Sequence, residues 1–147
     1  MQKKILVVDD EFLLLEMVSR YLMAHGYIVA TANSGTEAFS LLEQNRFDLT
    51  FCDLHMDDMD GFAILAACKA LHPRSKVILC SRDIVYETIS RAFASGADGF
   101  LAKPFLLGEL LHQTNKCLPW LQPENPDFMA AADPRDTAFL TDKLCYS

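Results

Sequence analysis

The chain has 147 residues, of which 51% are hydrophobic and 22% are charged, a balance typical of one globular domain. Its formal net charge of -7 argues against a nucleic-acid-binding surface, which would need clustered lysine and arginine. No stretch reaches the roughly 18 apolar residues of a membrane span, and the scattered cysteines form no CxxC pair, so we expect a cytoplasmic protein without a zinc site or a disulfide framework.

Short apolar runs alternate with amphipathic segments along the first four-fifths of the chain. The runs carry β-branched or aromatic residues with little alternation, as expected of strands buried on both faces. They are residues 5–8, 27–31, 47–52, 77–80 and 99–102. Apolar residues three or four apart predict the helices between them: Leu15, Val18 and Leu22; Ala38, Leu41 and Leu42; Ile64, Leu65, Cys68 and Leu71; Val85, Ile89, Ala92 and Phe93; Leu107, Leu110, Leu111 and Thr114.

Capping and stop signals support these helices. Ser34 and Glu37 have the spacing of a capping box at the start of the second helix. Gly26 and Gly96 stand where the first and fourth helices should end. Strands that alternate with helices require right-handed crossovers and a parallel sheet covered on both faces. The predicted fold class is therefore α/β, doubly wound, with five βα units.

The composition changes at Pro119. Four prolines fall within residues 119–134, and residues 119–147 carry more acids than bases. We therefore expect one domain at residues 1–118, followed at 119–147 by a Pro-rich acidic tail or a linker to an output domain that this chain lacks. A short helix near residues 137–144 that docks on the domain is the alternative for this segment.

Polar side chains follow several of the predicted strands, at the edge where ligands bind in open parallel sheets. They are Asp9, Asp10 and Glu11 after the first strand, Asp53 after the third, Ser81 after the fourth and Lys103 after the fifth. Any one of these residues alone is more often a helix cap or a turn residue. The prediction of a binding site therefore depends on their occurrence after several strands at once. Carboxylates brought together repel one another unless a cation neutralises them, and oxygen ligands of this kind suit Mg²⁺. A carboxylate beside a metal and an ammonium can accept a phosphoryl group.

Four motifs in this order resemble the receiver domains of bacterial two-component response regulators. They are ILVVDDE at 5–11, FCDLHMDDMDG at 51–61, ILCSRD at 78–83 and GADGFLAKPF at 96–105, and the similarity covers residues 3 to 118. The resemblance implies a flavodoxin-like fold with five parallel strands in the order 2-1-3-4-5.

The resemblance also implies roles for individual residues. Asp53 would be the phosphoacceptor, and Asp9, Asp10, Asp53 and the backbone carbonyl of His55 would bind Mg²⁺. Lys103 and Ser81 would contact the phosphoryl group, Ser81 and Phe100 would form the switch, and the Lys103–Pro104 peptide would be cis. His55 and Asp83 would occupy positions that tune phosphoryl lifetime.

The family implies a phosphorylation-dependent switch and not an enzyme with an external substrate. A sensor histidine kinase or a histidine phosphotransfer protein would donate to Asp53, and the chain would catalyse only its own phosphorylation and dephosphorylation. The surface around the fourth helix, fifth strand and fifth helix would then change its affinity for an output domain or protein, or for a second copy in a homodimer. No contact with nucleic acid or membrane is expected of this domain.

The sequence departs from the family pattern in two places. Met56 is followed by Asp57, where proline is common, which removes a rigid residue from the loop and adds a charge. The switch aromatic is often tyrosine, whereas Phe100 has no hydroxyl to form a hydrogen bond.

Alternative interpretations concern both the function and single residues. A Mg²⁺-dependent phosphohydrolase would usually carry a second Asp two residues after its nucleophile, where this chain has His55. A phosphorylation-independent interaction module would not need an intact set of Asp10, Asp53, Ser81 and Lys103. The loop acids Asp57, Asp58 and Asp60 could form a second metal site, but we expect an exposed acidic loop with Asp60 at the start of the third helix.

Overall fold

The computed structural model describes residues 2–118, which form five strands and five helices in alternation. In chain order these are β1 (Lys4–Val8), α1 (Phe12–Ala24), β2 (Ile28–Ala32), α2 (Gly35–Gln44), β3 (Leu49–Asp53), α3 (Gly61–Leu71), β4 (Lys76–Ser81), α4 (Tyr86–Ala94), β5 (Gly99–Ala102) and α5 (Leu107–Cys117). The tail predicted at 119–147 lies outside the described residues. No helix between residues 2 and 118 combines the length and the apolar character that a membrane crossing requires.

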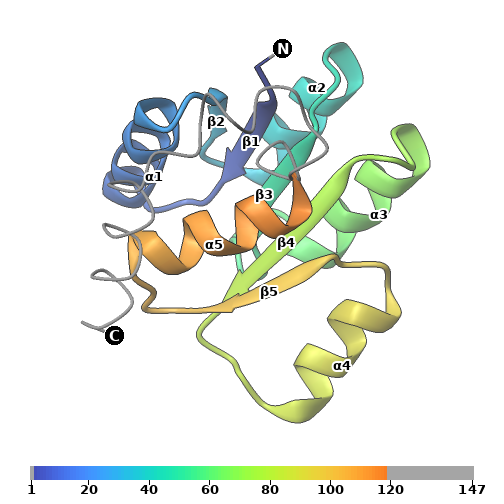
Figure 1. Cartoon of the computed structure of the whole chain (residues 1–147). Coiled ribbons are helices and arrows are strands. Elements are labelled where there is room, and N and C mark those ends of the chain that lie inside the picture. The colour runs from blue at the N-terminus through green and yellow to red at the C-terminus, as the bar shows by residue number, and fades with distance from the viewer. Residues whose placement is uncertain (1, 119–147) are drawn as a thin grey trace.

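The strands form one parallel sheet in the order β2-β1-β3-β4-β5 (Figure 1). This order and the parallel pairing confirm the predicted α/β class and doubly wound topology. The chain runs from β1 outward to β2 and then returns to β3 on the other side of β1, which is the reversal of strand order where such sheets bind ligands. Val8 at the end of β1 pairs with Cys52, one residue before the end of β3, so Asp9 and Asp53 emerge side by side.

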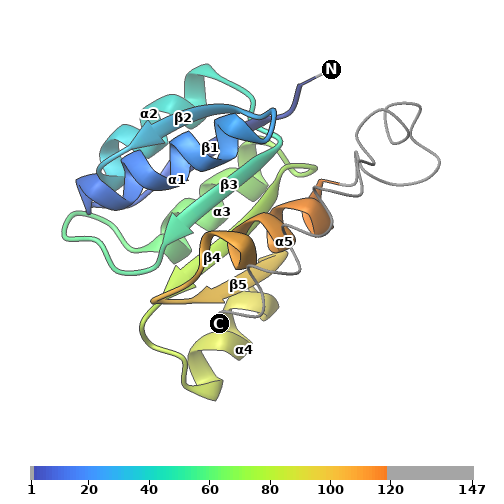
Figure 2. The ribbon, with the colours of Figure 1, turned by 60° about the vertical axis from the view of Figure 1, so that its left-hand side comes forward.

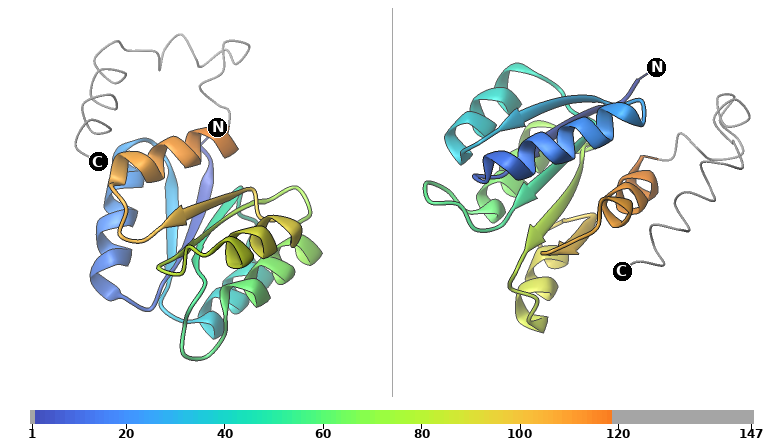
Figure 3. Two further views of the ribbon diagram at one scale, coloured as in Figure 1. Left: turned by 90° about the horizontal axis from the view of Figure 1, so that it is seen from below. Right: turned by 90° about the vertical axis from the view of Figure 1, so that its left-hand side faces the viewer.

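Two layers of helices cover the sheet, α1 and α5 on one face and α2, α3 and α4 on the other (Figures 1 and 3). Side chains alternate along each strand, so Ile5 and Val7 pack toward α1 and α5 whereas Leu6 and Val8 pack toward α2 and α3. All four are fully buried. Burial on both faces explains why the strands appear in the sequence as continuous apolar runs.

The ends of three helices follow the predicted signals in part. Gly26 and Gly96 have φ angles of 92° and 106°, in the left-handed region that glycine adopts without a steric cost. Ser34 caps α2 by accepting the N–H of Glu37 at 3.1 Å. The reciprocal bond of the predicted capping box, from the Ser34 N–H to the Glu37 side chain, is absent from the hydrogen bonds of residues 2–118.

Helix α4 differs most from the prediction. Of its four predicted core positions only Ala92 is buried, while Val85 and Phe93 are exposed and Val85 is the N-cap, not part of the helix. Helix α4 lies beside β5, the edge strand (Figure 2), so less of the sheet is available to cover its apolar side chains. Leu71, at the last position of α3, is also exposed, contrary to the prediction.

Candidate functional site

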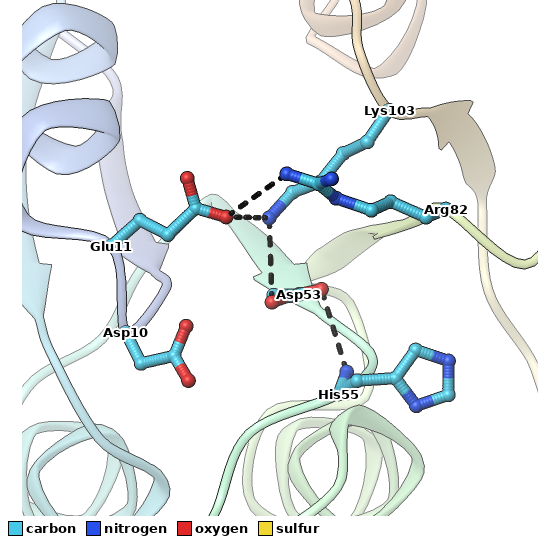
Figure 4. Close-up of a pocket in the computed structure, with 6 residues that line it drawn as sticks. All are labelled: Asp10, Glu11, Asp53, His55, Arg82 and Lys103. Carbon is cyan, nitrogen blue, oxygen red and sulfur yellow. Dashed lines mark hydrogen bonds and ion pairs between the residues drawn. The ribbon is translucent and has the colours of Figure 1, made fainter.

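The residues predicted at the strand ends converge at one edge of the sheet (Figure 4). Four of them, Asp10, Glu11, Asp53 and Lys103, line a pocket of about 170 Å³ together with His55 and Arg82. Asp53 is the last residue of β3, Asp10 follows β1 and Lys103 follows β5. The parallel order therefore brings together side chains that lie 43 to 93 positions apart in the chain.

Lys103 is the buried cation of the site. Its Nζ lies 2.7 Å from Asp9 Oδ2, 3.4 Å from Asp53 Oδ2 and 3.5 Å from Glu11 Oε1. Burial alone would lower the pKa of Lys103, but the hydrogen bond to Asp9 and the charges of Asp9 and Asp53 outweigh it and raise the pKa. The backbone helps to place this residue, because the Lys103 N–H donates to the Ser81 carbonyl at 2.9 Å. The Lys103–Pro104 peptide is cis, as the family resemblance implies.

Asp9, Asp10 and Asp53 form a carboxylate cluster in which one oxygen of each lies within 4.8 Å of the others. Burial is the main cause that raises the pKa of Asp53; the charge of Asp9 adds to it, and Lys103 opposes it. Burial and then the charge of Asp9 also raise the pKa of Asp10. The single ammonium of Lys103 thus leaves negative charge uncompensated, and a hard divalent cation with oxygen ligands fits this donor set.

Two further predicted residues lie close to the cluster. The His55 N–H donates to Asp53 Oδ1 at 3.4 Å, while its ring is exposed (Figure 4). Ser81 is fully buried at the end of β4, and its hydroxyl accepts the N–H of Asp83 at 2.9 Å. The Ser81 proton is therefore still available for donation to another group. Phe100 is half-buried in β5 and packs against the core on the α2–α4 face.

The acids in the loop between β3 and α3 have separate tasks, and within residues 2–118 they form no metal-binding group of their own. Asp60 caps α3 by accepting the Ala63 N–H at 3.0 Å. Asp58 reaches across to the start of α2, where it accepts the N–H groups of Gly35 and Thr36, each at 2.9 Å, and the Thr36 hydroxyl at 2.8 Å. Asp57 is near enough to Asp10 for its charge to raise the pKa of that carboxyl.

These contacts tie down a loop that lacks proline after Met56. Its ends are joined by the Gly61 N–H, which donates to the Leu54 carbonyl at 2.8 Å, and its tip is held to α2 by Asp58. The approach is close, because a Cβ at Gly35 would collide with the Cβ of Met59. We infer that Asp58 supplies, through hydrogen bonds, restraint that proline would have supplied through its ring.

Substituting asparagine for Asp58 should therefore lower the Tm by roughly a few degrees at neutral pH. Hydrogen bonds from Gly35 and Thr36 lower the pKa of Asp58, so its contribution to stability is present above the ordinary aspartate pKa and is lost as the pH falls through the lowered value. The difference in Tm between variant and wild type should accordingly shrink under acidic conditions, measured by thermal melting.

Asp60→Asn is the matched control, because it removes the same charge from the same loop while asparagine caps a helix about as well as aspartate. Equal melting curves for Asp58→Asn and Asp60→Asn would contradict the inferred restraint.

Two residues of the pocket, Glu11 and Arg82, were given no role by the sequence analysis. Glu11 Oε1 lies 3.5 Å from Lys103 Nζ and 3.7 Å from Arg82 Nη2. Both residues directly follow a predicted site residue, Asp10 and Ser81 respectively. Their positions next to predicted site residues could have indicated a place near the pocket. The sequence does not show, however, in which direction a long exposed side chain points.

Comparison with known proteins gives concordant matches. The family model described as "Response regulator receiver domain" matches residues 5–115. The transcriptional regulatory protein ZraR of Escherichia coli (strain K12) is 38% identical over 114 residues, which cover 78% of this chain and 26% of ZraR. The heme response regulator HssR of Staphylococcus haemolyticus is 33% identical over 126 residues, which cover 86% of this chain and 56% of HssR.

Solved structures agree with these sequence matches. The chemotaxis response regulator CheY4 of Vibrio cholerae superposes with a TM-score of 0.75 at 31% identity, covering 80% of this chain and 99% of CheY4. The activated receiver domain of DrrB gives a TM-score of 0.75 at 30% identity, covering 81% and 99% of the respective chains. The chain thus spans about a quarter to a half of the curated relatives it matches, but nearly all of these separately solved domains.

Proposed function

The chain belongs to the response regulator receiver domain family of two-component signalling, and we propose that it acts as a switch whose phosphoryl group is carried by Asp53. The observation that carries this proposal is the meeting of three carboxylates with one buried ammonium at the switch point of the sheet. Asp10 and Asp53 both line the open pocket, and of these two it is Asp53 whose carboxylate lies 3.4 Å from Lys103 Nζ and accepts a backbone N–H from the following loop.

The transfer starts with an attack by an Asp53 carboxylate oxygen on the phosphorus of a phosphohistidine. The phosphorus–nitrogen bond breaks, its electron pair leaves with the imidazole nitrogen, and the product is an acyl phosphate on Asp53. Lys103, 3.4 Å from Asp53 Oδ2, is placed to neutralise charge on the transferred oxygens. Asp9, Asp10, Asp53 and the carbonyl of His55 would hold Mg²⁺, which when bound supplies further positive charge to the same oxygens.

Ser81 and Phe100 would change their positions in response to the acyl phosphate. The Ser81 hydroxyl, which accepts the Asp83 N–H in the unphosphorylated chain, would donate its proton to a phosphoryl oxygen. Phe100 would follow and alter the surface of α4, β5 and α5, where Ile84, Val85 and Tyr86 are exposed around the start of α4. Such a switch is a shift between two conformations that the phosphoryl group binds unequally.

The proposed partners follow from this role. The donor would be a sensor histidine kinase or a histidine phosphotransfer protein, in the cytoplasm. The target would be an output domain or protein, since ZraR and HssR extend well beyond the matched region. A homodimer through α4, β5 and α5 is a further option for the activated state. The domain would act on no external substrate, because its chemistry ends with gain and hydrolysis of its own phosphoryl group.

Treatment with acetyl phosphate and Mg²⁺ tests the proposal directly. We expect one phosphoryl group per chain, stable in acid and labile in base as an acyl phosphate is, and absent when EDTA replaces Mg²⁺. Intact-mass spectrometry gives the stoichiometry, and peptide mapping after borohydride reduction locates the modified residue. Modification at a residue other than Asp53, or undiminished modification in EDTA, would overturn the assignment.

A further inference from the structure

Two cationic side chains contact the same carboxylate oxygen of Glu11, close to Asp53. Glu11 Oε1 lies 3.5 Å from Lys103 Nζ and 3.7 Å from Arg82 Nη2, and Figure 4 shows both contacts next to Asp53, among the residues that line the pocket. An oxygen anion is therefore stabilised from two directions at the mouth of the pocket. In the unphosphorylated chain that anion is a side chain of the protein itself.

The two cations differ in how firmly they are held. Lys103 is 6% exposed and bound to Asp9 at 2.7 Å, so it has little freedom to move. Arg82 is 77% exposed, and its pair with Glu11, itself 52% exposed, is long. Exposed ion pairs of this kind contribute little net free energy because water and salt screen them. Arg82 can therefore exchange its partner at low cost.

We propose that Arg82 is a second phosphoryl-binding cation and that Glu11 occupies its place until Asp53 is phosphorylated. The inference rests on the proposed function, since it assumes an acyl phosphate at Asp53. On phosphorylation the charge at Asp53 changes from about -1 to about -2, and Glu11 becomes a like-charged neighbour. Repulsion displaces Glu11, and the guanidinium turns to the phosphoryl oxygens, whose geometry matches its planar donors.

The site thus contains an internal competitor. Glu11 weakens the capture of a phosphoryl group by occupying Arg82 and by adding negative charge, and Arg82 strengthens capture once it is free. The consequence is a specific energetic coupling between the two residues: the contribution of Arg82 to anion binding should be larger when Glu11 is neutral. A purely structural role of the Glu11–Arg82 pair would give no such pattern.

Beryllofluoride, which activates the related DrrB receiver domain, is the probe, titrated in the presence of Mg²⁺ by calorimetry and ¹⁹F NMR. Arg82→Ala should weaken its binding about tenfold, as loss of a charge-assisted hydrogen bond would. Glu11→Gln should tighten binding, and Arg82→Lys should recover part of the loss because it keeps the charge without the planar fork. In the Glu11→Gln background, Arg82→Ala should cost more than it does in the wild type.

Arg20→Ala is the matched control, since Arg20 is an exposed arginine that pairs with Glu16 at 3.3 Å on α1, outside this pocket. It should bind the probe as the wild type does. Equal affinity of Arg82→Ala and wild type, or additive effects of the Arg82 and Glu11 substitutions, would overturn the inference. If the wild type failed to bind the probe, or if Asp53→Asn bound it as tightly as the wild type, the proposed function itself would be wrong. The two failures are therefore distinguishable.

Discussion

Replacing Asp53 by asparagine is expected to abolish the phosphoryl adduct that forms with acetyl phosphate and Mg²⁺. The substitution preserves the size of a side chain that is only 8% exposed, but an amide is a poor nucleophile toward phosphorus and removes one charge from the metal site. Intact-mass spectrometry of both proteins under identical conditions measures the effect, which should be complete within detection. An adduct at full stoichiometry in the variant would show that another residue is the acceptor.

The same substitution should stabilise the metal-free domain at neutral pH. Burial, with the charge of Asp9, raises the pKa of Asp53 despite Lys103, so the folded state disfavours the carboxylate relative to the unfolded chain. Stability associated with this group is therefore present below the ordinary aspartate pKa and lost as the pH rises through the raised folded value. Asparagine does not ionise, so the variant does not lose this stability as the pH rises.

Thermal or denaturant unfolding in EDTA, from about pH 7 to about pH 4, tests whether the substitution stabilises the metal-free domain. The Asn variant should be the more stable protein at the upper end, and the gap should close as Asp53 of the wild type becomes protonated. Addition of Mg²⁺ should reduce the gap at neutral pH, because a ligand that binds the folded state stabilises it, and the wild type binds it more tightly. A variant less stable than the wild type across this range would contradict the prediction.

The strand order agrees with the one that the family resemblance implies. The meeting of the acidic cluster with Lys103 agrees with the sequence prediction for a physical reason. Buried strands leave long apolar runs, and parallel pairing necessarily brings the carboxyl ends of neighbouring strands to one edge. Asp9, Asp53 and Lys103 could therefore be placed together without knowledge of any side-chain contact.

Features that depend on side-chain reach could not be predicted in the same way. The periodicity of α4 indicated a buried face. The implied strand order placed β5 at the edge of the sheet, but it did not show how little of the apolar face of α4 would be covered there. Asp58 was interpreted as one of several exposed acids, whereas it binds the start of α2, a helix 22 and 23 positions away in the chain. Glu11 and Arg82 come from different strand ends, and only the folded geometry shows that they share a contact.

Replacing Asp10 by alanine should abolish Mg²⁺-dependent phosphorylation while the domain stays folded. Asp10 is exposed, but partial desolvation by the neighbouring residues and the charges of Asp9 and Asp57 raise the pKa of its carboxyl, so the metal-free fold gains nothing from its charge. A bound Mg²⁺, by contrast, would lose one of its few carboxylate ligands. The free energy of unfolding without metal should therefore be unchanged or higher, while affinity for Mg²⁺ should fall by about tenfold or more.

Thermal melting with and without Mg²⁺ separates the effect of Asp10→Ala on the metal-free fold from its effect on Mg²⁺ binding. Wild-type Tm should rise with Mg²⁺ concentration, since binding to the folded state adds free energy that grows with the ratio of ligand to Kd. Asp10→Ala should show little rise over the same range. Glu16→Ala is the control, because Glu16 is a nearby exposed acid whose only ion pair among residues 2–118 is with Arg20, and it should respond to Mg²⁺ as the wild type does. If Asp10→Ala and Glu16→Ala responded equally, Mg²⁺ would not depend on the cluster at the end of β1, and the metal site would have to be sought elsewhere.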